Sequence, residues 1–200
     1  MDIILNYSVE MNIESTIFPE IFVIKPKVYS DRRGWFMETF RLDLLENTIG
    51  FDLKFCQDNL VNSSYGVLRG LHYQKPPFTQ SKLVSVVSGK IIDIIVDVRN
   101  GSPNFGKHIS LELSDQNKKQ VFIPKGFAHG YICISKSSVV SYKVDNFYNK
   151  EAEVTITPYD SDLKIDWKIP KEKIILLNTG KKRFLFSQVN HFDFKTNLYE

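Results

Sequence analysis

The fold is decided by the stretch Ile91-Ile92-Asp93-Ile94-Ile95-Val96-Asp97-Val98. Its β-branched residues predict a strand, and apolar side chains occupy both of the alternating faces. A strand that is apolar on both faces lies between two layers of structure, because each face must be covered. The sequence therefore predicts a layered β fold built around residues 91–98.

Short strand-like segments separated by turns surround this stretch. A single short helix is predicted at residues 42–49, with Gly50 as its stop signal. Short strands at this spacing are typical of a sandwich or barrel, so the predicted fold class is all-β. The further predicted strands are residues 22–29, 35–40, 82–88, 109–113, 120–123, 139–144 and 153–156.

The composition is that of one soluble domain. The chain has 200 residues, enough for one well-buried core, and its 26 basic and 23 acidic residues are scattered, which argues against nucleic acid as a partner. Two cysteines without CxxC spacing suggest neither a disulfide framework nor a zinc site. No apolar run reaches the ~20 residues of a membrane span. We therefore expect a single cytoplasmic domain at residues 1–200, with residues 169–200 as a tail packing on the barrel.

Two motifs carry histidines in strand-like surroundings. They are Leu68-Arg69-Gly70-Leu71-His72-Tyr73-Gln74 and Ile123-Pro124-Lys125-Gly126-Phe127-Ala128-His129-Gly130. Alone, His72 would be a structural histidine, and His129 is explained equally well as a residue that fixes a turn. Arg69 and Lys82 flank His72 in sequence, so cations would gather around an imidazole if both strands line one cavity. Such a cavity would attract an anionic substrate.

A partner acid and the absence of a metal complete this hypothesis. Tyr142 is the best partner acid, because a phenol beside a cation can have its pKa lowered, although a lone strand tyrosine usually serves packing. A catalytic metal needs about three protein ligands, yet Gln74 stands two residues after His72 and no acid lies between His72 and Asp93. We expect no metal and no cofactor.

Five motifs then occur in order between residues 11 and 167. They are residues 26–40 (PKVYSDRRGWFMETF), 57–59 (QDN), 68–74 (LRGLHYQ), 97–106 (DVRNGSPNFG) and 123–130 (IPKGFAHG). In this order they resemble the dTDP-4-dehydrorhamnose 3,5-epimerase family, the metal-free cupin epimerases of nucleotide-sugar synthesis. The resemblance implies a cupin-type jelly-roll barrel with a few short helices. It also implies a homodimer with exchanged N-terminal strands.

The resemblance further implies a reaction and a set of roles. The expected reaction inverts C3, or C3 and C5, of a 4-keto sugar linked to a nucleotide diphosphate, for surface polysaccharide synthesis. By position, His72 resembles the general base, Tyr142 the general acid on the opposite face of the sugar, and Lys82 a cation near the ketone oxygen. Positions that resemble family substrate contacts are Arg33, Glu38, Gln57, Asn59, Arg69, His129 and Glu153, with Tyr148 and Tyr29 expected to stack on the nucleotide base.

The chain departs from the family pattern at three places. The family aspartate that orients the catalytic histidine is missing, because no acid lies between Lys173 and Asn190; Asn178 and Asp93 are the alternative replacements. Leu60-Val61 stands where the family usually has His-Ser. Residues 1–10 precede the usual family start, as an N-terminal extension.

These departures leave several questions open. The carrier, dTDP or GDP, the sugar, hexose or heptose, and the number of inverted centres do not follow from the sequence. A nucleotide-sugar 3,4-ketoisomerase and a non-catalytic nucleotide-sugar-binding cupin are the alternative functions.

Overall fold

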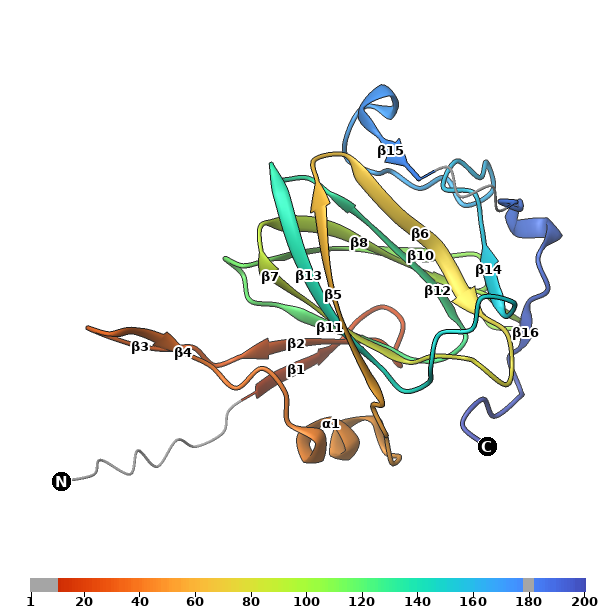
Figure 1. The fold of residues 1–200 in the computed structure, drawn as a ribbon. Helices are drawn as coiled ribbons and strands as arrows, with labels where there is room; N and C mark the ends of the chain where they lie inside the picture. The colour runs from red at the N-terminus through yellow and green to blue at the C-terminus, as the bar shows by residue number, and fades with distance from the viewer. Residues whose placement is uncertain (1–10, 178–181) are drawn as a thin grey trace.

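Two antiparallel β-sheets face each other and form a barrel (Figure 1). The computed structural model describes residues 11–177 and 182–200. The first sheet has the strand order β1-β2-β11-β7-β13-β5, and the second has the order β10-β8-β12-β6-β14, with β15 beside β6. The predicted all-β barrel is confirmed. Residues 1–10 and Asn178, which carried predictions, lie outside the described residues.

From β5 to β14 the chain passes repeatedly from one sheet to the other. The first sheet contains β1 (Met11–Ser15), β2 (Phe22–Pro26), β5 (Gln57–Ser64), β7 (Lys82–Ser88), β11 (Gln120–Ile123) and β13 (Ser137–Val144). The second contains β6 (Val67–Gln74), β8 (Lys90–Asp97), β10 (His108–Ser114), β12 (Phe127–Cys133), β14 (Glu153–Thr155) and β15 (Ile175–Leu176). Outside them lie the hairpin of β3 (Tyr29–Asp31) and β4 (Gly34–Phe36), the pair β9 (Arg99–Asn100) and β16 (Phe192–Asp193), the helix α1 (Leu42–Ile49), and the 3-10 turns η1 (Lys171–Lys173) and η2 (Phe186–Gln188).

Local sequence signals placed most of these elements correctly. The helix α1 has the predicted bounds, and Gly50 ends it with a left-handed φ of 82°, a conformation that costs glycine little. Two predicted strands were wrong in extent. Residues 22–29 split into β2 and β3, since β2 ends at Pro26, which has no N–H for the ladder. The strand predicted at 35–40 stops at Phe36.

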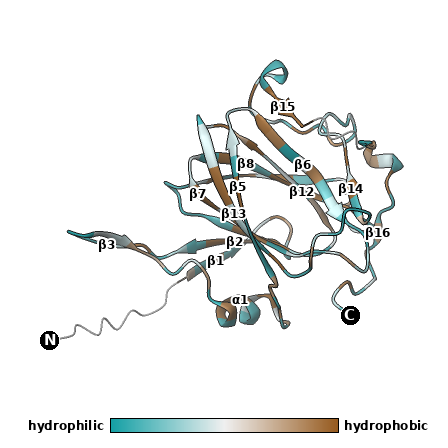
Figure 2. Ribbon diagram, viewed as in Figure 1, coloured by the Kyte–Doolittle hydropathy of each residue, from teal (hydrophilic) through white to brown (hydrophobic). Residues whose placement is uncertain are grey.

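The strand β8 lies between two apolar cores, as its sequence predicted. Figure 2 shows hydrophobic residues along the strands of both sheets. Ile91 and Ile95 face the barrel interior, while Ile92, Ile94 and Val96 belong to a second core on the outer side of the sheet. That outer core is completed by side chains from the C-terminal part of the chain, namely Leu163, Trp167, Phe186, Val189 and Phe192. Each fully buried side chain of this kind stabilises the fold by about 1.5–3 kcal/mol. The C-terminal segment therefore holds the second sheet in place from outside.

The first sheet is covered in the same way by α1. Leu45 of the helix is 2% exposed and packs with Ile24, Leu83 and Phe122 on the outer face of this sheet. Both outer faces are thus covered. Inside the barrel, apolar side chains fill one end, and the other end is hollow.

In the part of the chain that the structure describes, no helix is long and apolar enough to span a membrane.

Candidate active site

A cavity of about 590 Å³ occupies the hollow end of the barrel, between the two sheets. Alternate residues of each strand line it, because successive side chains of a strand point to opposite faces. β5, β7 and β13 form one wall and β6, β12 and β14 the facing wall. The strand residues that line it include Gln57, Asn59, Val61, Lys82, Val84, Val140, Tyr142, Val144, Arg69, His72, Gln74, His129, Tyr131, Glu153 and Thr155.

An irregularity in β6 places Arg69 and His72 on the same wall. Residues three apart in a regular strand face opposite sides, yet both line the cavity. The pairing of β6 with β12 shifts register here: His129 pairs with His72, whereas Tyr131 pairs with Arg69. One residue on β12 thus faces two on β6, which is a β-bulge. The bulge supplies the change of phase that brings the arginine and the histidine together.

Two glycines permit this bulge. Gly70 has a φ of +114°, and a Cβ built there would lie 2.6 Å from both the Gly130 Cα and the His129 carbonyl oxygen. A Cβ at Gly130 would lie 2.7 Å from the Arg69 carbonyl oxygen. Both strands therefore need glycine where their backbones approach most closely, which explains Gly70 and Gly130 in the two histidine motifs.

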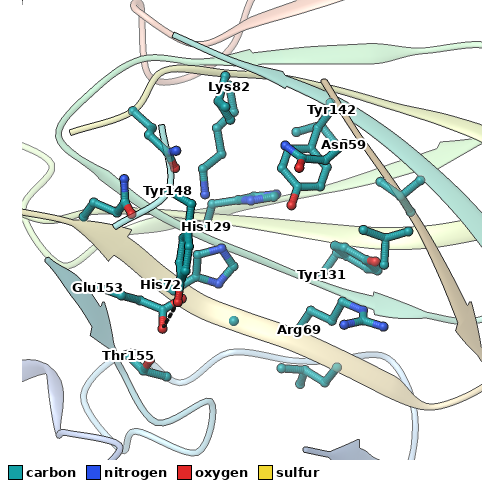
Figure 3. Close-up of a pocket in the computed structure, with 18 of the residues that line it drawn as sticks. Asn59, Arg69, His72, Lys82, His129, Tyr131, Tyr142, Tyr148, Glu153 and Thr155 are labelled. Carbon is teal, nitrogen blue, oxygen red and sulfur yellow. Dashed lines mark hydrogen bonds between the residues drawn. The ribbon is translucent and has the colours of Figure 1, made fainter. Parts of the chain in front are cut away.

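The predicted base, acid and cation meet in the cavity. His72 extends from β6, and Tyr142 of β13 and Lys82 of β7 extend from the facing sheet into the same cavity, where the Lys82 amine points toward His72 (Figure 3). Lys82 is 6% exposed, and burial lowers its pKa from 10.5 to about 8, while the carboxylates of Asp93 and Glu153 act in the raising direction. At neutral pH the amine is therefore still mainly protonated. The arrangement offers a base and an acid on facing walls of a cavity that also holds a cation.

The predicted effect of a cation on Tyr142 is outweighed by burial. The pKa of the Tyr142 phenol is raised above its usual value of 10, with burial as the main cause, while the positive charge of Arg69 lowers it by less. The prediction of a lowered pKa was wrong, because sequence spacing cannot weigh desolvation against a neighbouring charge. Tyr142 is protonated at neutral pH, as a proton donor must be.

The buried carboxylate of Asp93 serves His129 and not His72. Asp93 Oδ2 lies 2.8 Å from His129 Nε2, and Asp93 is fully buried. Its Oδ1 has no hydrogen-bond partner within the described chain. The alternative that Asp93 replaces the family aspartate beside His72 is therefore wrong. The reason is one of register: Asp93 of β8 pairs with β12, which lies between β8 and β6.

Polar groups at the cavity's open side come from β5, β14 and the loop before β14. Gln57 Nε2 donates to Asn59 Oδ1 at 2.8 Å, which fixes both amides toward the cavity. The Tyr148 hydroxyl lies 3.4 Å from Glu153 Oε2. The cavity thus includes the predicted residues Gln57, Asn59, Arg69, His129, Tyr148 and Glu153 together with the base, acid and cation.

Three predicted contact residues lie elsewhere in this chain. Tyr29 and Arg33 belong to the β3–β4 hairpin, which projects away from the barrel in Figure 1, and neither lines the cavity of its own chain. The Arg33 side chain is 78% exposed and pairs with Asp31 at 2.6 Å. Glu38 follows this hairpin and is also absent from the cavity lining. The term arm is used below for residues 29–38.

The sequence reasoning missed other cavity residues. Tyr131 stands two residues after His129 on β12, so strand periodicity alone would have placed it on the same wall. Thr155 stands two residues after Glu153 on β14, so the same periodicity would have placed it on the cavity wall. Lys150 and Arg183 line the cavity from irregular segments, and no local signal pointed to them. Within the described residues, no group of three or more His, Cys, Asp or Glu side chains is arranged to hold a metal.

This fold and this site define a class, that of acid–base isomerases built on a cupin-type barrel. The chain belongs to the dTDP-4-dehydrorhamnose 3,5-epimerase family, whose family model matches residues 15–185. A dTDP-4-dehydrorhamnose 3,5-epimerase of Shigella flexneri is 44% identical over 159 residues, covering 80% of this chain and 88% of the relative.

Solved structures agree with this membership. The crystal structure of a dTDP-4-dehydrorhamnose 3,5-epimerase from Elizabethkingia anophelis superposes with a TM-score of 0.86 at 45% identity, covering 90% of this chain and 99% of the other. A dTDP-6-deoxy-D-glucose-3,5-epimerase from Legionella pneumophila, in complex with dTDP-4-keto-L-rhamnose, gives 0.88 at 39% identity, covering 94% and 100%. The protein is a nucleotide-sugar epimerase with the predicted cupin-type fold.

Proposed function

We propose that this enzyme inverts both C3 and C5 of a dTDP-linked 4-keto-6-deoxyhexose, without a cofactor. The observation that carries the proposal is the placement of His72 and Tyr142 on facing sheets of one cavity, with Lys82 lining the same cavity. Inversion at carbon needs a base on one side and an acid on the other, and a single histidine cannot supply both. The dTDP carrier and the two centres follow the relatives named above.

The first step is removal of a proton from the carbon next to the ketone. His72 takes this proton, and the C–H electrons move into the ketone, which becomes an enolate. The buried ammonium of Lys82 stabilises the negative enolate oxygen, and its low exposure strengthens this interaction. In this scheme Lys82 must be protonated when the enolate forms.

The second step places a proton on the opposite face of the same carbon. Tyr142 donates its hydroxyl proton and becomes a phenolate, whose charge is opposed by Arg69. His72 releases its proton to solvent and Tyr142 regains one, so the enzyme is restored. C3 and C5 both flank the C4 ketone, so one cation at the ketone oxygen serves both inversions.

We further propose that two chains form a homodimer with exchanged N-terminal strands, in which the arm of each enters the partner's cavity. The support is the position of the arm, which extends away from its own barrel and carries Tyr29, Arg33 and Glu38. It also exposes Trp35 and Phe36, with 57% and 51% of their surface accessible. An aromatic pair exposed on a projecting hairpin is typical of an interaction surface. Arg33 would bring a cation for the diphosphate and Tyr29 a ring for the base.

We propose a cytoplasmic location. Cys56 and Cys133 are both free thiols, one exposed and one buried, as expected in a reducing compartment.

Deuterium exchange tests the reaction. The enzyme is incubated in D₂O with dTDP-4-keto-6-deoxyglucose, and NMR locates the label. We expect deuterium at both C3 and C5; no exchange would refute the reaction, and label at C3 alone would refute double inversion. His72→Asn should abolish exchange while binding of dTDP persists, and Lys90→Gln, on the surface, is the matched control. A parallel assay with the GDP-linked sugar tests the carrier.

Mixing two inactive variants tests the arm. His72→Asn damages the cavity, and the double variant Arg33→Ala, Glu38→Ala damages the arm. If the arm enters the partner's cavity, a mixed dimer contains one intact site, and an equimolar mixture recovers about a quarter of wild-type activity. No recovery after verified exchange of subunits would refute the arrangement.

A further inference from the structure

Residues 192–200 form a tail that the reaction scheme above does not use. The tail begins at β16, where Phe192 is 6% exposed, and the side chains of residues 193–197 are exposed. Tyr199 is partly buried again, and its ring packs on Phe51 with the two centroids 4.3 Å apart. The tail lies beyond residues 15–185, which the family model matches. Its contacts therefore need an explanation of their own.

The Tyr199 hydroxyl joins two segments of the barrel. Its oxygen accepts the backbone N–H of Lys125 at 3.1 Å and lies 2.9 Å from Ser81 Oγ. Ser81 is fully buried, and its own N–H donates to Asp145 Oδ1 at 2.6 Å. The term clasp is used below for the Tyr199 hydroxyl, Ser81, the Lys125 N–H and the Asp145 carboxylate.

The clasp lies at the end of three adjacent strands, β11, β7 and β13, and Lys82 stands at this end. Lys82 is the first residue of β7, and the pairings of β7 with both neighbours end at Lys82. Ser81 directly precedes Lys82 in the chain. Asp145 directly follows the last residue of β13, and Lys125 lies two residues after the last residue of β11. The clasp thus connects the chain just outside the three strands.

The clasp is on the side of the sheet that faces away from the cavity. Successive side chains alternate, so Lys82 lines the cavity while Ser81 does not, and Asp145 and Tyr199 are also absent from the lining. A substrate in the cavity therefore does not touch the clasp. Of the residues with a role in the reaction, Lys82 is the one bonded directly to a member of the clasp, and a misplacement of about 1 Å can slow a reaction roughly 10²-fold.

We propose that Tyr199 is a positioning residue for Lys82: its hydroxyl fixes Ser81, and through Ser81 the start of β7, so that the Lys82 ammonium stays at the ketone oxygen. The inference rests on the proposed function and deepens it, because it gives the tail a part in the same reaction. Burial raises the pKa of Tyr199 to about 12, so the hydroxyl keeps its proton over the pH range in which Lys82 titrates.

The test removes the Tyr199 hydroxyl and leaves its ring. We expect Tyr199→Phe to lower kcat about tenfold, as a displacement of less than about 1 Å would, and to change KM by less than about twofold. In the Lys82→Met background the same substitution should have no further effect on kcat, because there is no ammonium left to misplace. Ser81→Ala should lower kcat in the same way.

Ser85→Ala is the matched control for Ser81→Ala. Ser85 is four residues further along in β7, and its Oγ donates to the Ser141 carbonyl at 3.2 Å without lining the cavity. Its removal should leave kcat and KM at their wild-type values. Urea denaturation shows that each variant is folded before its kinetics are compared.

Three results would overturn the inference. They are an unchanged kcat in folded Tyr199→Phe, a loss of kcat/KM that comes from a raised KM, and a fall in kcat that is equally large in the Lys82→Met background, which would show a merely structural effect. The proposed function has a separate readout. No deuterium exchange by the wild-type enzyme would refute the reaction, whereas exchange by the wild type together with one of the three results refutes only the positioning role of Tyr199.

Discussion

The pKa of Lys82 leads to the sharpest prediction. Burial lowers this pKa from 10.5 to about 8, a change equivalent to roughly 3 kcal/mol in favour of the neutral amine. The enolate needs the protonated form, which dominates below pH 8 and is lost as the pH rises through 8. The pKa of Tyr142 is raised above 10, so its loss of a proton belongs to a higher pH range.

The expected result is a pH profile of kcat/KM whose fall on the alkaline side, the alkaline limb, follows the deprotonation of Lys82. Between pH 7 and pH 9, kcat/KM should fall about tenfold, because one pKa unit above the midpoint leaves about a tenth of the amine protonated. Lys82→Met should lower kcat by about 10²–10³-fold, the usual cost of losing one oxyanion donor, and should remove the limb near pH 8.

The assay is NMR-monitored turnover of the dTDP-linked 4-keto sugar in buffers of constant ionic strength. Lys125→Met is a control of the same type, since Lys125 pairs with Asp145 at 3.6 Å and does not line the cavity. It should keep the wild-type limb if the variant is folded. A wild-type kcat/KM that is flat to pH 9.5, or an unchanged limb in Lys82→Met, would refute the reasoning.

Three further predictions concern the acid, the bulge and the buried pair. Tyr142→Phe should retain deuterium exchange at the original face and lose inversion by about 10²–10⁴-fold; equal loss of both rates would remove Tyr142 as the acid. Gly70→Ala should lower the free energy of unfolding by at least about 2 kcal/mol more than Gly50→Ala, since both have positive φ but only Gly70 has backbone within 4 Å; urea denaturation giving equal losses would contradict the crowding argument. Asp93→Asn should lower the free energy of unfolding by about 1–3 kcal/mol, because the hydrogen bond between the buried carboxylate and His129 is lost. The exposed Asp58→Asn should lower it by less than about 1 kcal/mol in the same denaturation assay.

The candidate site was partly predictable from the sequence. Alternation in β5, β7 and β13 places Asn59, Lys82 and Tyr142 on inward faces, and a reader of the sequence can count these positions. Strand periodicity also places Tyr131 beside His129. Counting fails in β6, where the bulge changes the phase between Arg69 and His72.

The sequence by itself determined most of the strands, the helix at residues 42–49, and the need for a layer on each side of β8, because each of these depends on neighbours along the chain. Tertiary structure alone decided that Arg69 and His72 share a wall, that Asp93 bonds His129, and that burial governs the pKa values of Lys82 and Tyr142. These outcomes depend on which strands pair and how deeply a group is buried. Both are set by contacts between segments far apart in sequence, and local pattern carries no information about them.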